Sequence, residues 1–330
     1  MKILRHYSNQ SGIALMVVLW VLVLLMALAT EFAFSMKGEV NTTRNFKEDV
    51  ESYHLAKAGV HLGMAEVLLP ASFHALPSEQ ELVIGTSILP IMDPKEETLE
   101  EPKTTYRPTK RKNIPLGRGT ITYTLEDENR KIPINAVTRN TLVKVLTIAG
   151  IETIEKRDII ADSILDWIDA DTKHRLNGAE NNFYQNLTPP YFAKNAPIES
   201  IDELLKIRGV DKNITYGNDK LVGLNQFFTV YNIQAINVNT APRNVLLALF
   251  PEPEVNLIIK TREEKGFYNN STSDYFRIQS TGKIKGSPTN HTINTVIQKI
   301  SGKDGPKLLT HYWDDNSLKS IYKSGFKTGQ

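Results

Sequence analysis

The residues most capable of chemistry are carboxylates near the middle of the chain. Asp162, Asp166 and Asp169 are spaced i, i+4 and i+7, so on a helix they share one face. Asp171 follows, and a stretch rich in Asn and Gly leads to Glu180. Oxygen ligands around a glycine-bearing turn are typical of Ca²⁺, a hard ion that takes about six to eight of them. The pattern predicts a calcium site, although it lacks EF-hand spacing.

Two other interpretations of these carboxylates stay open. They could form a solvated acidic helix end with Asn caps, or they could be the paired carboxylates of a hydrolase. No other motif indicates a substrate groove or an enzyme. The 330 residues include no cysteine, which excludes disulfides, a thiol nucleophile and Cys-ligated metals, and the seven histidines are scattered. With 39 basic and 37 acidic residues, the net charge of +2 argues against nucleic-acid binding driven by electrostatics.

The N-terminal segment predicts a membrane-spanning helix. Residues 6–30 contain no charged side chain, and 13–29 are all apolar, enough to cover most of a hydrocarbon core about 30 Å thick. Lys2 and Arg5 precede this run and place the N-terminus in the cytoplasm. The run could be a secretory signal peptide cut after the Ala-Leu-Ala of 27–29, a simple anchor, or a prepilin cut between Gly12 and Ile13.

A helical stripe continues beyond the apolar run and favours the third interpretation. Its apolar members are spaced three, four or seven residues apart: Phe46, Val50, Tyr53, Val60, Met64 and Val67. The pattern predicts one helix over 13–69, about 85 Å long, that ends before Pro70. Such a spine behind a basic leader ending in Gly resembles the type IV pilin and pseudopilin superfamily. That superfamily usually has Glu as the fifth mature residue, and the apolar Val17 here implies a subunit at the tip of a filament.

The rest of the chain changes character several times. Residues 70–118 are rich in proline and predict a loop, with a short strand near 82–84. Alternation predicts a strand over 120–125. Helical spacing follows over 140–148, 156–169 and 201–207, within a helical block at 131–222.

An internal repeat adds a second candidate function. The turn that begins at Asn135 aligns with the one at Asn239, and Arg139 aligns with Arg243. Together with the Gly209 turn, this resembles the helix-hairpin-helix modules of membrane-anchored competence receptors, which bind DNA phosphates. Against DNA binding, Asp211 places an anion where a phosphate would lie.

Four segments in order resemble the general secretion pathway protein K family, the large minor pseudopilins of type II secretion: DSILDWIDADT, NGAENNFY, NAPIESIDELLKIRGV and INVNTAPRNVLLAL. The resemblance implies an α+β fold, in which a pilin-like long N-terminal helix packs on an antiparallel sheet and a large all-α domain with helix-hairpin-helix-like turns is inserted. The implied organisation is a leader at 1–12, the helix at 13–69, a pilin-like domain at 70–130 and 223–330, and an inserted helical domain at 131–222, extending to about 260 at most. Returning strands are expected at 227–233, 275–281, 292–300 and 307–313.

The same resemblance implies a mechanical role without enzymatic activity. The subunit would initiate assembly at the tip of the pseudopilus and contribute to export of folded proteins across the outer membrane. Prepilin peptidase would cut between Gly12 and Ile13, with N-methylation of Ile13. Implied partners are the I-type and J-type minor pseudopilins, the major pseudopilin and the inner membrane, with the globular part in the periplasm and no nucleic acid. The implied calcium ligands are Asp169, Asp171, Glu180 and Asn182.

Overall fold

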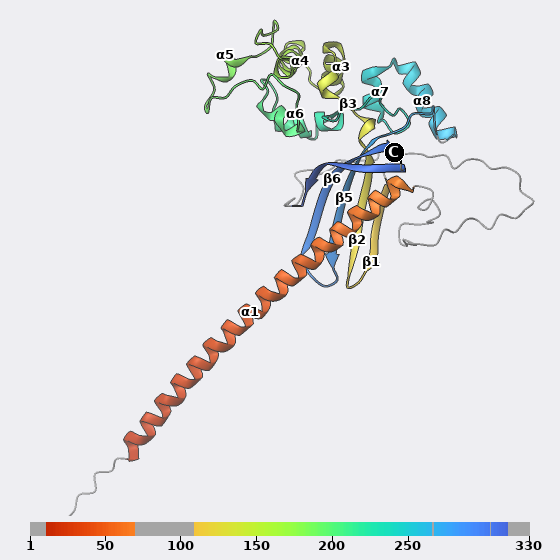
Figure 1. Cartoon of the computed structure of the whole chain (residues 1–330). Helices are drawn as coiled ribbons and strands as arrows, with labels where there is room; N and C mark the ends of the chain where they lie inside the picture. Colours follow the sequence, from red (N-terminus) through yellow and green to blue (C-terminus); the bar gives the residue numbers. More distant parts are fainter. Residues whose placement is uncertain (1–10, 70–108, 266, 304, 316–330) are drawn as a thin grey trace, which may run out of the picture.

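The computed structural model describes residues 11–69, 109–265, 267–303 and 305–315. Its most prominent element is α1 (Ser11–Leu68), a continuous helix of 58 residues. Its N-terminal half projects away from the rest of the molecule, and its C-terminal half lies on a sheet (Figure 1). The predicted long helix is confirmed, and it ends two residues before Pro70.

The sheet has five antiparallel strands in the order β1-β2-β5-β6-β7. Their bounds are β1 (Thr109–Leu116), β2 (Gly119–Asp127), β5 (Tyr275–Ile284), β6 (Asn290–Gly302) and β7 (Gly305–Asp314). Four of them coincide with strands expected from the sequence: β2 from its alternation, and β5, β6 and β7 from the family resemblance. The strand β1 was not predicted, because three features hide the alternation of apolar and polar residues in its sequence. Most of its residues are polar, Asn113 has a left-handed backbone conformation, and Pro115 lies within the strand.

α1 packs closely on the central strands because small residues line the contact. Ala56, Val60 and Val67 of the helix contact Phe276, Ile278, Ile293 and Ile297 of β5 and β6. A Cβ atom added to Gly282 would lie 2.2 Å from the backbone oxygen of Ser52, so only glycine fits there. The predicted arrangement of a long helix on an antiparallel sheet is therefore confirmed.

The helical module, residues 128–265, is inserted between β2 and β5 (Figure 1). It sits at the end of the sheet opposite the projecting half of α1. Its α-helices are α3 (Arg139–Ile148), α4 (Ile154–Ile168), α5 (Asn181–Tyr184), α6 (Lys212–Tyr216), α7 (Arg243–Leu249) and α8 (Glu252–Lys265). Its other elements are the 3-10 turns η1 (Glu128–Arg130), η2 (Ile134–Ala136), η3 (Ile201–Lys206) and η4 (Leu224–Gln226), and the short strands β3 (Ile132–Pro133) and β4 (Phe228–Thr229).

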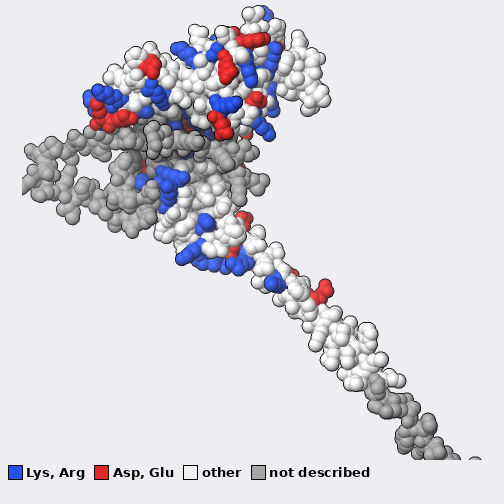
Figure 2. Space-filling model, turned by 180° about the vertical axis from the view of Figure 1, so that it is seen from behind, with Lys and Arg blue, Asp and Glu red and all other residues white. Residues whose placement is uncertain are grey.

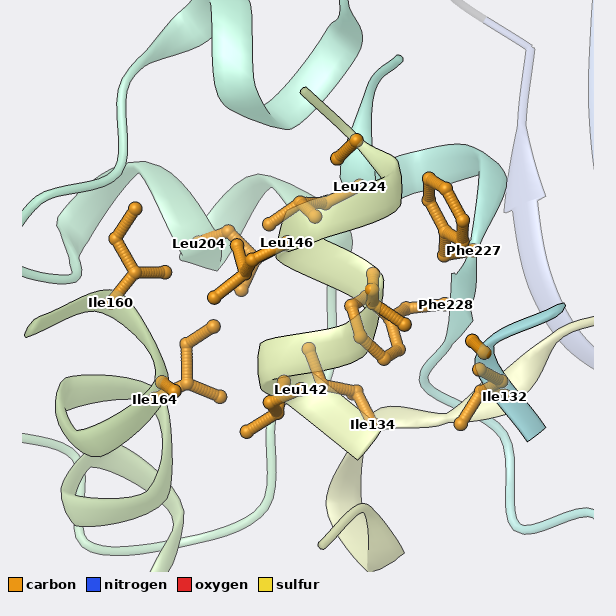
Figure 3. Packing of buried hydrophobic residues seen from close by; sticks show 14 of the residues in the cluster. Ile132, Ile134, Leu142, Leu146, Ile160, Ile164, Leu204, Leu224, Phe227 and Phe228 are labelled. Carbon is orange, nitrogen blue, oxygen red and sulfur yellow. The ribbon is translucent and has the colours of Figure 1, made fainter. Parts of the chain in front are cut away.

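The core of the helical module is apolar and separate from the core under α1. Figure 3 shows Leu142 and Leu146 of α3 beside Ile160 and Ile164 of α4. Phe228 and its neighbours close the core from the side of the short sheet. Two expectations were wrong in detail: 227–233 forms only β4, which pairs in parallel with β3 and not with the main sheet, and 201–207 forms a 3-10 turn. The strand expected near 82–84 lies outside the described residues.

Buried polar groups join the helical module to the sheet. The carboxylate of Asp127, at the end of β2, accepts hydrogen bonds from the Ser273 and Thr240 hydroxyls, each at 2.6 Å, and from the Asn237 amide at 3.1 Å. Glu128, which is 1% exposed, pairs with Arg277 of β5. Because these partners come from β2, β5 and residues 237–240, they hold the module and sheet together at one point.

Candidate functional site

The predicted acidic site forms at the C-terminal end of α4. The Thr153 hydroxyl caps the start of this helix, and the carboxylates of Asp162 and Asp166 are buried along it. Asp169 is the residue that ends it. The loop that follows returns close enough that a Cβ atom added to Gly178 would lie 1.8 Å from Oδ2 of Asp166. Gly178 therefore lets this loop close against the helix.

Two arginines occupy part of the acidic face. Nε of Arg139 donates to Oδ1 of Asp162 at 2.6 Å. Nη1 of Arg175 lies 2.6 Å from Oδ1 of Asp166 and 2.5 Å from Oδ2 of Asp169. Asp162 and Asp166 are thus paired with protein cations, while one oxygen of Asp169 is not.

Four oxygens beside these pairs are buried and have no hydrogen-bond partner. They are Oδ1 of Asp169, both carboxylate oxygens of Glu180, and Oδ1 of Asn195. Burial raises the pKa of Glu180, and the charges of Asp166 and Asp169 raise it further. Leaving buried polar atoms unpaired is costly, so an unpaired set of this kind indicates a ligand.

The oxygen set fits a hard cation. All four atoms are oxygens, the neighbouring charges are negative, and Ca²⁺ accepts carboxylate and amide oxygens together. In the described part of the chain, no group of three or more His, Asp or Glu side chains lies at metal-binding spacing. The carboxylates Asp169 and Glu180 with the Asn195 amide would hold the ion, and it would supply the positive charge that Glu180 lacks.

The predicted ligands do not all meet at this place. Asp169 and Glu180 contribute buried oxygens to it. Asp171 is exposed, and its Oδ1 accepts from the backbone N–H of Lys173, although its backbone oxygen accepts from the Asn195 amide at 2.8 Å. Asn182 is exposed, outside the group of buried oxygens.

Asn195 was not found from the sequence. It lies 15 residues beyond Glu180, and the sequence between them contains no metal-binding motif. Its backbone has φ of +46°, a left-handed conformation that Asn tolerates better than most residues. Asn residues are common in loops, so the presence of Asn195 in a loop could not have identified it as a ligand from the sequence.

The helix-hairpin-helix-like turns bind protein groups. Arg243 pairs with Glu252 at 3.0 Å, as Arg139 does with the acidic face. The Asp211 carboxylate accepts from the backbone N–H of Ile214 and caps α6. Asn135 bridges the backbone of Ile198, and Asn239 accepts from the backbone N–H of Tyr268. These asparagines therefore bridge backbone groups of segments that are distant in the sequence.

The predicted processing segment is the start of α1. Gly12 and Ile13 lie in the first turn of this helix, and the side chain of Val17 is 56% exposed. The helix continues without interruption through 27–29, the candidate signal-peptide site. By length and composition, α1 could cross a membrane, and its most apolar window makes no buried contact.

Comparisons with known proteins agree with this arrangement. Residues 124–217 match the family described as type II secretion system (T2SS), protein K. The putative protein K of Escherichia coli (strain K12) is 26% identical over 220 residues, which cover 63% of this chain and 60% of that protein. Protein K of Aeromonas hydrophila is 27% identical over 211 residues, covering 62% and 61%.

Over the matched residues, the chain is similar to the type II secretion system protein K family. The matches span 60% and 61% of the relatives' own lengths.

A solved structure shares the fold of this chain. It is the crystal structure of the GspK-GspI-GspJ complex from the enterotoxigenic Escherichia coli type 2 secretion system. The TM-score is 0.55 and the identity 19%, and the match covers 83% of this chain and 98% of the other. A likeness at this identity bears on the fold alone.

Proposed function

We propose that this chain is the minor pseudopilin at the tip of a type II secretion pseudopilus, where it initiates assembly and contributes to export of folded proteins across the outer membrane. The observation that carries this proposal is the form of α1. One unbroken helix exposes an apolar N-terminal half and packs its C-terminal half on a sheet. This form suits a subunit that is anchored in the inner membrane, faces the periplasm and can join a bundle of similar helices.

Two features favour the tip over the shaft. The helical module adds bulk at the end of the sheet remote from the projecting half of α1 (Figure 1), and such bulk fits poorly within a closely packed helical filament. Val17 stands where most pseudopilins have Glu. A subunit with no neighbour above it has no ammonium group to neutralise, so an apolar residue leaves no charge unpaired there.

The proposed partners are the I-type and J-type minor pseudopilins, the major pseudopilin and prepilin peptidase. Support for the first two comes from the fold, because the solved structure with this fold is titled as a complex of GspK with GspI and GspJ.

Calcium binding is the second part of the proposal. Asp169, Glu180 and Asn195 would hold the ion through the four buried unpaired oxygens, with Asp171 adjacent. The ion would tie the loop after α4 to the segment around residue 195. Its role would be to stabilise the helical module, with no chemical step.

The N-terminus of the mature chain tests the proposed function. Full-length protein coexpressed with a prepilin peptidase is purified from membranes and its N-terminal peptide is analysed by mass spectrometry. We expect a chain that begins at N-methylated Ile13, and an uncut chain when the peptidase is omitted. A mature chain that begins at Thr30 would identify a signal peptide and overturn the proposal, as would an unprocessed chain in the presence of an active peptidase.

A further inference from the structure

A basic groove lies at the base of the sheet, where α1 leaves it. The groove has a volume of about 680 Å³ and lies between α1, the β1–β2 turn and the β5–β6 turn. Its charged lining residues are Glu39, Arg44, Lys47, Glu48, Arg118 and Lys285. Four are cationic and two anionic, and the exposed Lys283 lies two residues from Lys285. Figure 2 shows Lys and Arg side chains gathered at this end of the sheet.

Hydrogen bonds hold the three walls of the groove in place. The hydroxyl of Ser287, in the β5–β6 turn, donates to Glu48 of α1 at 2.6 Å. Arg118, in the β1–β2 turn, pairs with Glu51 of α1. The backbone N–H of Lys285 donates to the backbone oxygen of Arg118 at 3.2 Å, which joins the two turns. The cationic side chains are therefore presented from a fixed framework.

Three lysines of this region keep their charge for an external ligand. The two arginines form ion pairs, Arg44 with Glu48 and Arg118 with Glu51. Lys47, Lys283 and Lys285 are exposed, and within the described residues none of them lies within ion-pair distance of a carboxylate. Since an exposed ion pair is nearly neutral, Lys47 and Lys285 carry most of the positive charge that lines the groove, against the single carboxylate of Glu39. Lys283 adds a further positive charge from the other face of β5, at the same end of the sheet.

The groove begins close to the expected membrane surface. Twenty residues from Ile13 span about 30 Å of hydrocarbon, and a headgroup layer of roughly 5–8 Å brings α1 to the region of Lys37. Glu39, at the lower rim, follows about 3 Å later along the helix axis, and Lys47 about 15 Å later. Helix tilt and the length of lysine side chains shorten these distances, and the electrostatic attraction extends over about 8 Å.

We propose that this groove binds the phosphate headgroups of anionic phospholipids in the membrane that α1 enters. Lys47, Lys283 and Lys285 attract the headgroups, and the fixed framework then holds the base of the sheet against the membrane. This interaction belongs to the subunit before it leaves the membrane for a filament. It requires insertion of α1 but is independent of the calcium site and of the tip position.

The absence of cysteine allows a direct test on the full chain. A single fluorophore is attached to Leu116→Cys, an exposed position at the end of β1 and two residues from Arg118. The protein is placed in nanodiscs of phosphatidylcholine alone, or with about 30% phosphatidylglycerol, each with a trace of lipid that carries a headgroup quencher. Each lysine near an anionic surface raises the binding constant about fivefold. We therefore expect the ratio of quenched to unquenched protein to rise at least tenfold with phosphatidylglycerol.

Matched variants separate headgroup binding from general effects. Exchanging Lys47, Lys283 and Lys285 together for Gln should return quenching to the level of phosphatidylcholine alone, and exchanging them for Arg should preserve it. Gln at three exposed lysines of the helical module, Lys144, Lys212 and Lys220, makes the same charge change and should have no effect. A fluorophore at Leu176→Cys, 93% exposed in the helical module, should show no response to phosphatidylglycerol. Equal quenching in both lipids, or an undiminished response in the triple Gln variant, would overturn the proposal.

Discussion

Three buried carboxylates of this chain meet three different environments. Asp127 accepts hydrogen bonds from neutral donors, and burial nevertheless raises its pKa. Glu128 is equally buried, but the charges of Arg277 and Lys131 outweigh that burial and lower its pKa to about 2. The pKa of Glu180 is raised by burial and by the charges of Asp166 and Asp169, which outweigh the lowering effect of the Asn181 backbone and the Asn195 side chain. The first two hold the fold together, whereas Glu180 is part of the proposed calcium site.

Glu180→Gln should have opposite effects with and without calcium. A carboxylate whose pKa is raised on folding contributes stability at low pH that is lost as the pH rises through the folded-state pKa. Without metal at pH 7, the variant should therefore be more stable than the wild type by about 1 kcal/mol in urea unfolding. At a calcium concentration about 100 times the Kd, the wild type should gain about 2.7 kcal/mol and the variant far less.

The control for this measurement is Glu199→Gln, whose side chain is 83% exposed. It should follow the wild type in both conditions. If Glu180→Gln also gains the full stability with calcium, Glu180 is not a ligand and the acidic face is better explained as a structural one.

Glu128→Gln should destabilise the chain and flatten its response to acid. The variant removes the carboxylate charge that pairs with Arg277, whose side chain is 32% exposed, and should cost about 1–3 kcal/mol in unfolding free energy. Because the pKa of Glu128 is lowered on folding, its contribution is present above the unfolded-state pKa of about 4.3 and is lost as the pH falls toward about 2. Urea unfolding from pH 6 to pH 2 measures both effects. An equal loss in the exposed control Glu152→Gln would contradict this assignment.

At the scale of elements, the close contact between α1 and the sheet depends on a glycine in β5. Gly282 of β5 faces the backbone of α1, and an added Cβ atom would lie 2.2 Å from the oxygen of Ser52 and 2.5 Å from the nitrogen of Ala56. Backbone atoms cannot rotate away as a side chain can. The helix itself would therefore have to shift.

Gly282→Ala should weaken the packing of α1, while Gly38→Ala should strengthen the helix. The first change forces overlap and should cost at least about 2 kcal/mol of stability. Gly38 also lies in α1, but no atom lies within 4 Å of an added Cβ, so alanine there should add about 0.5–1 kcal/mol. Thermal unfolding in detergent compares the two. Equal destabilisation by both changes would indicate an effect on the helix and not on its contact with the sheet.

At the scale of the whole molecule, the two ends of the elongated structure are built differently. One end is an exposed apolar helix, and the other is the helical module with the proposed calcium site (Figure 1). A subunit with this form can present its helix to neighbours below while its bulk stays outside the filament.

The proposed tip position can be tested directly on assembled pseudopili. Gold bound to Leu176→Cys, an exposed position on the helical module, should be found by electron microscopy at filament ends and absent from shafts. A labelled major pseudopilin should decorate the shaft and serves as the control. Gold from this chain distributed along shafts would rule out the tip assignment.

The sequence alone determined the elements whose residues are close together in the chain. Periods of 3.6 and 2 indicated α1, α3, α4 and the strand β2, because each pattern repeats locally. The strands β5, β6 and β7 were expected from the family resemblance. The spacing of Asp162, Asp166 and Asp169 and the following Glu180 likewise located the acidic site.

Only the tertiary structure decided which distant residues meet. The Asn195 amide donates to the backbone oxygen of Asp171, and Arg175 pairs with Asp166 and Asp169. Asp127 collects donors from 113 and 146 residues away, and Lys47 approaches the turn that carries Lys285. None of these residues shares a local period with its partners. Their meeting depends on how α1, the sheet and the helical module pack, and that packing is settled by apolar burial and close glycine contacts across the whole chain.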